Sequence, residues 1–316
     1  MTSDKFLAIK LPNHLGDVSG TIASMHTADN ADVLDFLQFL SPSADDEANI
    51  KAYSSPVSKE FYRNFLDWLF ATFDTEEQAF RKKLIEGLHL KHGSKVLITG
   101  CGFGEDIPIC ADIVGQDGEI HAQDLSREMV LSAAQSHNRD NTLFTISNAL
   151  DLPYRDDYFD AVFHFGGINL FGDTRTAIKE MTRVCKTGGR VVFGDEGLAP
   201  HLKDTEFGKI AIANIDLWKT DAPLAMLPPN AADIRLEYVL GNCFYVISFS
   251  IGDGLPKMNI DVEHKGLRGG SARSRYFGQL EGVTSEAKEK IYNAARAEGI
   301  SVHKLLSRII SEAKLD

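Results

Sequence analysis

Three glycines between an apolar run and a helical pattern form the stretch of the sequence that is best suited to hold a ligand. Gly100, Gly102 and Gly104 follow the apolar run 96–99 in a GxGxG arrangement. Glycine reaches positive φ and has no Cβ, so a ligand can come close to the backbone amides at the start of the next helix. A dinucleotide-binding loop has its third glycine at the position of Glu105, whose charge would face a pyrophosphate. The loop therefore favours a ligand without phosphate groups.

An aspartate at the end of the next apolar run adds a polar group that can serve the same ligand. Asp124 stands 20 residues after Gly104 and directly follows the run 120–123. A carboxylate at this place can accept hydrogen bonds from both hydroxyls of a ribose. Alone, the loop is also compatible with a tight turn, and the aspartate with a helix cap. Together, in this order, they indicate a nucleoside ligand.

The segments around these residues alternate between short apolar runs and helical patterns. The runs cover 96–99, 120–123, 143–147, 161–165 and 191–194, and the helical patterns between them include 126–137 and 174–185. Because parallel strands need crossover connections, this rhythm predicts a parallel sheet with helices on both faces. Three later runs at 234–240, 245–251 and 258–262 alternate apolar with polar residues, which predicts antiparallel strands at the sheet edge. The expected fold class is α/β, with a doubly wound, mostly parallel, seven-stranded sheet in a core domain over residues 91–265.

Helical extensions are expected on both sides of this core. Residues 1–90 combine an apolar helical pattern at 33–40, a polar loop at 41–47 and two amphipathic helices over 58–90.

Residues 266–316 form the C-terminal extension, with two helices split at Gly299. The second helix carries an apolar stripe of Val302, Leu305, Leu306, Ile309 and Ile310. Such a stripe has to be covered. The rhythm of the extension is also typical of a ribbon-helix-helix module, but its mixed charges favour packing over nucleic-acid binding. The stripe could cover the chain's own sheet or pair with a second subunit. Because the helices follow a complete strand alternation and the linker Gly269-Gly270, we expect a homodimer, the commonest symmetric oligomer.

Composition and charge exclude several classes of protein. The chain has 316 residues, 43% apolar and 25% charged, as in folded globular proteins. With 33 basic and 45 acidic residues its net charge is −12, which disfavours general binding to nucleic acid or anionic membranes. The four cysteines are widely spaced without a CxxC pair, so neither disulfides nor a metal site is expected. No leader-like or membrane-spanning stretch is evident, and we expect a cytoplasmic location.

In these features the chain resembles the class I S-adenosylmethionine-dependent methyltransferases, most closely the branch that includes the ubiquinone and menaquinone biosynthesis methyltransferases. The motifs that carry the resemblance are the glycine loop and the segments 124–129, 148–153, 158–162 and 181–191. They occur in the family's order between about residues 95 and 195. The resemblance implies a Rossmann-like methyltransferase fold. It also implies methyl transfer from S-adenosylmethionine to an O, N, C or S atom of a small molecule, mainly by proximity and orientation.

The resemblance also implies which residues hold the cofactor. The glycine loop would bind its methionine end, Asp124 its ribose, and the residues after the second and third runs its adenine. The residues implied are Gly100, Cys101, Gly102, Gly104, Asp124, Leu125, Met129, Asn148, Ala149, Phe165 and Gly166. Two positions depart from the family. Ile98 stands where an acid usually contacts the cofactor's amino group, and Asn148 replaces an adenine-side acid, although its amide oxygen can still accept.

Candidate catalytic residues belong to the segment 164–171 at the end of the fourth run, which we expect to border the transferred methyl because ligands of doubly wound sheets lie beyond the carboxyl ends of the strands. His164 has a side chain suited to a general base, and Asn169 is a second polar candidate. A single histidine in an apolar strand is also compatible with a core residue whose hydrogen bonds are satisfied.

Five further residues are candidates for the substrate side. Tyr53 and Tyr62 would belong to the lid that the resemblance implies, and Asp195 and Glu196 follow the fifth run, where they could instead cap a helix. Arg268 belongs to a basic cluster at 264–275 that could clamp a carboxylate or phosphate of the substrate, or form a solvated charged face.

Two other functions remain compatible with the sequence. One is a non-catalytic S-adenosylmethionine sensor that dimerises through its C-terminal extension. The other is a methyltransferase for an RNA or protein target, which a basic tract near the site would favour. Because only the short cluster at 264–275 is basic, a small-molecule substrate is the preferred interpretation.

Overall fold

The computed structural model describes residues 4–10, 33–37, 44–53, 58–265, 271–277 and 283–313. The chain divides into two compact units, residues 1–256 and 257–316. The sequence placed the corresponding boundary between residues 265 and 266. Each unit is considered by itself below.

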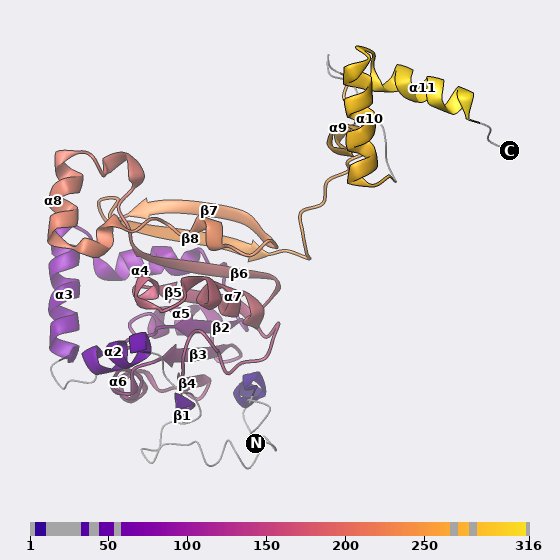
Figure 1. Cartoon of the computed structure of the whole chain (residues 1–316). Helices are drawn as coiled ribbons and strands as arrows, with labels where there is room; N and C mark the ends of the chain where they lie inside the picture. Colours follow the sequence, from indigo (N-terminus) through magenta and orange to yellow (C-terminus); the bar gives the residue numbers. More distant parts are fainter. Residues whose placement is uncertain are drawn as a thin grey trace. The chain divides into compact units, whose positions relative to one another are not determined.

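A mixed sheet forms the centre of the first unit, with the strand order β1-β4-β3-β2-β5-β6-β8-β7 (Figure 1). The strands are β1 (Val33–Asp35), β2 (Lys95–Thr99), β3 (Glu119–Asp124), β4 (Thr142–Ile146), β5 (Phe159–Phe165), β6 (Cys185–Glu196), β7 (Ala231–Val239) and β8 (Phe244–Ile251). Strands β1 to β6 run parallel, and β8 pairs antiparallel with both β6 and β7. The predicted doubly wound α/β fold with antiparallel edge strands is confirmed, with eight strands in the described residues instead of seven.

Helices cover both faces of this sheet, as the apolar strands require. The α-helices of the first unit are α2 (Ala44–Tyr53), α3 (Ser58–Thr72), α4 (Glu77–Glu86), α5 (Ile107–Val114), α6 (Arg127–His137), α7 (Thr174–Val184) and α8 (Glu206–Asn214). Short 3-10 helices lie at Asp4–Ala8, Ile168–Leu170, Pro200–Leu202, Asp216–Lys219 and Leu224–Met226. Val96 and Ile98 of β2 pack in one core layer with α3 to α6, whereas Leu97 packs in the other layer with α7.

The order in which successive strands join the sheet reverses between β2 and β5, although the two strands are parallel. From β2 the chain proceeds to β3 and β4 on one side, and it then returns to place β5 and β6 on the other side. In open α/β sheets a ligand binds at this kind of switch point, outside the carboxyl ends of the strands. The glycine loop follows β2 directly, so the fold sets the predicted ligand loop at the switch point.

Three local predictions were wrong. The pattern at 33–40 is helical in spacing, but Val33–Asp35 forms the strand β1, because its apolar side chains complete the sheet beside β4. Residues 38–43 lie outside the described part of the chain. The loop predicted at 41–47 gives way to helix α2 at Ala44. The run 258–262 is no strand, since it has no pairing partner among the described residues and leaves Met258 71% exposed.

The second unit is helical in its described residues. It contains α9 (Ala272–Phe277), α10 (Ser285–Ala297) and α11 (Val302–Glu312). The two predicted helices are present, split at Gly299 with φ +64°. Leu305 of the apolar stripe is 2% exposed inside the unit, whereas Ile309 and Ile310 are 41% and 57% exposed.

Among the described helices, none combines the length and the apolar character that crossing a bilayer would require. The four cysteines are buried and form no disulfide.

A buried ion pair ties helix α4 to the turn that precedes α5. The Arg81 guanidinium is 5% exposed, and its Nη1 lies 3.0 Å from each carboxylate oxygen of Asp106. Its Nε donates to Glu77 at 2.8 Å. Because both charges are buried, each depends on the other for compensation.

We predict that Arg81→Met lowers the free energy of unfolding by about 3 to 5 kcal/mol, because it leaves the Asp106 carboxylate buried without its cation. Urea unfolding of the purified variant measures the loss. The neighbouring Lys82 is exposed on the same helix, so Lys82→Met is the matched control and should change the free energy by no more than about 0.5 kcal/mol. Equal losses in the two variants would contradict the assignment.

Candidate functional site

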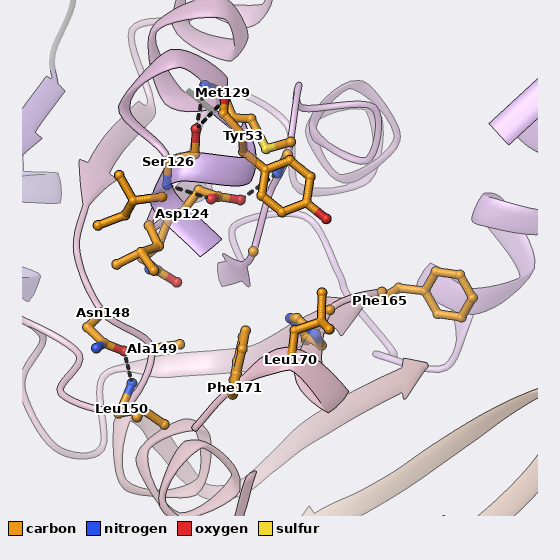
Figure 2. A pocket seen from close by; sticks show the side chains of 18 of the residues that line it. Tyr53, Asp124, Ser126, Met129, Asn148, Ala149, Leu150, Phe165, Leu170 and Phe171 are labelled. Atoms are coloured by element: carbon orange, nitrogen blue, oxygen red, sulfur yellow. Dashed lines mark hydrogen bonds between the residues drawn. The ribbon is translucent and has the colours of Figure 1, made fainter. Parts of the chain in front are cut away.

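A cavity of about 830 Å³, counted with the solvent at its mouth, opens at the carboxyl ends of β2, β3 and β5 (Figure 2). Its walls come from the glycine loop, the segments after β3, β4 and β5, and helices α2 and α3. The lining residues are Ile50, Tyr53, Tyr62, Gly100, Gly102, Gln123, Asp124, Leu125, Ser126, Met129, Asn148, Ala149, Leu150, His164, Phe165, Gly166, Gly167, Leu170 and Phe171.

The glycine loop requires its glycines for two different reasons. Gly100 and Gly104 have φ values of +59° and +91°, a region that side chains disfavour. A Cβ on Gly100 would lie 2.9 Å from Cε1 of His164, and one on Gly104 would lie 2.7 Å from Cδ2 of His137. Gly104 and the buried Cys101 therefore shape the loop without lining the cavity, whereas Gly100 lines it.

The Asp124 carboxylate holds this loop against the end of β3. Its Oδ2 accepts from the backbone N–H of Gly102 at 2.9 Å, and its Oδ1 accepts from that of Ser126 at 2.9 Å (Figure 2). Burial raises the pKa of Asp124, and these backbone donors oppose the rise. The Leu125 N–H is a third backbone donor that favours the charged form, and the carboxylate lines the cavity, where its oxygens can also accept hydroxyl hydrogens.

The residues predicted for an adenine lie next to Asp124. Leu125, Met129, Asn148 and Ala149 all line the cavity. The Asn148 side-chain oxygen accepts from the Leu150 N–H at 2.9 Å, which makes an Asx turn within its own loop. The turn fixes the direction of the Asn148 side chain beside the cavity.

His164 is the buried basic group of the site. It is 1% exposed, and its Nδ1 lies 2.9 Å from the Thr99 carbonyl oxygen. Because a carbonyl only accepts, Nδ1 carries the hydrogen and Nε2 carries the lone pair. Nε2 is buried and has no hydrogen-bond partner among the described residues. Burial lowers the pKa of His164, although the charge of Asp195 opposes this.

Three predicted polar residues lie behind the cavity wall instead of lining it. The Asn169 N–H donates to Asp195 Oδ2 at 2.6 Å, and its amide nitrogen donates to the Glu196 carbonyl at 2.7 Å. Tyr245 donates to the Asn169 oxygen at 3.0 Å. Burial, together with Asp195, raises the pKa of Glu196 to about 9. These groups support the loop that carries Leu170, and Arg268 lies outside the described residues.

The aromatic residues take different orientations around the cavity. Figure 2 shows the Phe165 ring turned away from the other labelled side chains, and it packs against Phe80 and Phe244 at centroid distances of 5.4 and 5.8 Å. Phe165 therefore contributes its backbone to the wall. The Tyr53 carbonyl accepts from the Ser126 hydroxyl at 3.4 Å, which ties α2 to the start of α6.

Sequence reasoning missed four of the lining residues. They are Ile50, Gln123, Ser126 and Leu150. Most are direct neighbours of predicted residues, and Ser126 could have been found as the residue that caps α6, since its hydroxyl accepts from the Met129 N–H. Ile50 carries no such signal, because its place depends on how α2 folds back over the sheet.

Comparison with known proteins finds similarity to methyltransferases. Residues 97–193 match the family model described as a methyltransferase domain. The demethylmenaquinone methyltransferase of Bacillus licheniformis is 31% identical over 137 residues, which cover 43% of this chain and 59% of that protein. The demethylmenaquinone methyltransferase of Bacillus subtilis is 32% identical over 140 residues, which cover 43% and 60%. The chain thus spans about three fifths of the length of these relatives.

A solved structure shares the fold. Phosphoethanolamine N-methyltransferase 2 of Haemonchus contortus, in complex with S-adenosyl-L-methionine, aligns with a TM-score of 0.52 and 13% identity over 65% of this chain and 60% of that chain. The resemblance to class I methyltransferases that the motifs indicated is confirmed by the family match, and the structural likeness supports the fold.

We predict that the His164 ring stays neutral in the folded protein at pH values where a free histidine is protonated, because burial holds its pKa below 6.5. Nitrogen NMR of the imidazoles, assigned with His164→Asn, should show the Nδ1–H tautomer and a midpoint below 6.5. As the pH falls through 6.5, the unfolded chain binds a proton that the folded chain does not, so the free energy of unfolding decreases. A midpoint at or above 6.5, or the opposite tautomer, would contradict this.

Proposed function

We propose that this chain, which carries a class I methyltransferase domain over residues 97–193, binds S-adenosylmethionine in the cavity and transfers its methyl group to a small apolar acceptor. The observation that carries the proposal is the convergence of the glycine loop, Asp124 and neutral His164 on one cavity at the switch point of the sheet. Its lining combines apolar side chains with a few polar groups, as small-molecule and cofactor sites do.

The residues present fit the adenosine part of this cofactor. Asp124 offers two oxygens to the ribose hydroxyls while its backbone hydrogen bonds keep the carboxylate in place. Leu125, Met129 and Ala149 offer apolar surface for a ring, and Asn148 offers an oxygen at its edge. The open backbone at Gly102 lets the ligand come close to the loop.

The chemistry asks little more of the protein than alignment. When bound, S-adenosylmethionine supplies a methyl group on a sulfonium sulfur, which leaves as a neutral thioether. Holding the acceptor in line is worth about 7 to 11 kcal/mol. For an acceptor that loses a proton, the lone pair on His164 Nε2 takes it, with the ring fixed by the Thr99 carbonyl. The Phe171 ring meets the His164 ring edge-on at 5.3 Å, and His164 is 1% exposed.

The walls of the cavity favour an uncharged ring as the acceptor. Ile50, Leu170 and Phe171 present apolar side chains, and no lysine or arginine is among the described lining residues. A phosphate or a nucleic-acid backbone would need such cations. Because relatives with 31% and 32% identity are demethylmenaquinone methyltransferases, a demethylmenaquinol is the acceptor to test first.

We predict that the protein binds S-adenosylhomocysteine and not NAD in calorimetric titrations. Asp124→Ala should weaken this binding by about 1.5 to 3 kcal/mol, roughly 10- to 100-fold, because hydrogen bonds to a charged group are lost. Glu128→Ala, an exposed position at the start of α6, is the control and should bind as the wild type does. Tight binding of NAD without any response to S-adenosylhomocysteine would end the proposal.

Transfer itself is tested with a labelled methyl donor and a short-chain demethylmenaquinol, alongside RNA and a denatured protein mixture. Label in the quinol supports the proposed acceptor. Label only in RNA or protein indicates a macromolecular target, and binding without transfer to any acceptor indicates a sensor.

We also propose that the second unit pairs two copies of the chain. Within the second unit taken by itself, Ile309 and Ile310 are exposed on α11, although Leu305 of the same stripe is buried. Pairing with the same face of a second copy covers both residues.

We predict that the full-length protein sediments as a dimer and that Ile310→Lys shifts it towards the monomer, because the charge enters the apolar contact. Ser307→Lys places the same charge at another exposed position of α11 and should leave the dimer intact. Sedimentation velocity at several concentrations measures both. A wild-type protein that is monomeric throughout would show that the stripe is not an interface.

A further inference from the structure

The cofactor proposed for this site ends in an amino acid, whose ammonium group needs a negative partner. At the position where similar proteins usually carry an acid for this group, this chain has Ile98. Ile98 is 1% exposed and packs in the core layer with α3 to α6. Another carboxylate must therefore compensate the ammonium charge.

Glu105 brings a carboxylate to the glycine loop from its other end. A Cβ built on Gly102 would have Tyr62 Oη at 3.6 Å and Glu105 Oε2 at 3.9 Å as its nearest side-chain oxygens. Gly102 and Tyr62 line the cavity, whereas Glu105 is not among its lining residues and brings only its Oε2 to the loop beside Gly102, which has φ +55° and no side chain. The two oxygens thus flank one point above the loop.

The Glu105 carboxylate lacks a counter-ion of its own. The nearby Arg81 pairs with Asp106 and Glu77, and Glu105 makes no ion pair among the described residues. Glu105 is half-buried, and burial raises the pKa of its carboxyl, against the effects of Arg81 and of its own backbone N–H. A partly desolvated carboxylate of this kind is stabilised when a cation binds beside it.

Tyr62 supplies the complementary donor. It lines the cavity, and the Arg81 guanidinium, which can only donate, faces its oxygen. Burial and the charge of Glu105 raise the pKa of Tyr62, so the hydroxyl keeps its hydrogen. With its oxygen turned towards Arg81, the hydroxyl can donate its hydrogen into the cavity.

We propose that Glu105 and Tyr62 recognise the amino-acid end of the cofactor, with Glu105 binding the ammonium group and Tyr62 the carboxylate. This inference rests on the proposed function. It gives Glu105 a role beyond excluding a pyrophosphate, and it moves Tyr62 from the substrate side to the cofactor side. This position for the amino-acid end is consistent with Asp124 holding the ribose, because the Gly102 N–H donates to the Asp124 carboxylate.

Three adenosyl ligands separate the two contacts by calorimetric titration. S-adenosylhomocysteine has both charged groups, its decarboxylated analogue S-adenosyl-3-thiopropylamine has the amine alone, and 5′-methylthioadenosine has neither. Glu105→Gln should weaken the first two by about tenfold or more and leave the third unchanged. Tyr62→Phe should weaken only S-adenosylhomocysteine.

Asp112→Asn, exposed on α5, removes the same charge at a distance from the loop and is the matched control. Glu105→Asp keeps the charge and provides a second variant, with partial recovery of binding expected. If Glu105→Gln binds all three ligands as the wild type does, or loses 5′-methylthioadenosine equally, the inference is wrong. If the wild type binds none of the three, the proposed function itself is wrong, and this inference falls with it.

Discussion

One carboxylate connects the parts of the site. Asp124 ends β3, yet it accepts hydrogen bonds from the backbone of the glycine loop after β2 and from Ser126, the cap of α6. Two strands and a helix therefore meet at a single side chain. Since the group is buried, its charge depends on these backbone donors, and the loop conformation depends on the charge. The same side chain fixes the floor of the cavity and offers its carboxylate oxygens to a ligand.

The parts of the fold and of the site that could be predicted are those encoded by residues close together in the sequence. The glycine loop, Asp124 and the segment around Asn148 each act through a few consecutive residues, so their spacing was informative. The position of Ile50 depends on the path of a separate helix, and no local pattern encodes that path. The strand at 33–35 was misread for a related reason, because a short apolar run takes the structure that its neighbour β4 offers.

Polar residues at strand ends illustrate a second limit. Asp195 and Asn169 have the right types and positions to face a substrate, but their hydrogen bonds are made to each other and to Tyr245. A sequence shows that a carboxylate follows a strand, whereas only the fold shows whether the group points at the ligand or secures the loop beside it. The roles of His164 and Tyr62 depend in the same way on partners distant in sequence, the Thr99 carbonyl and Arg81.

The edge strand β7 affects how two copies of this protein can meet. β7 carries the exposed charged residues Asp233, Arg235 and Glu237, and its pairing with β8 is interrupted between Ala232 and Arg235. An irregular, charged edge is a poor template for another strand, because an added chain would have to desolvate these side chains and match a broken ladder. The β7 edge thus disfavours edge-to-edge pairing of the sheet with a second sheet.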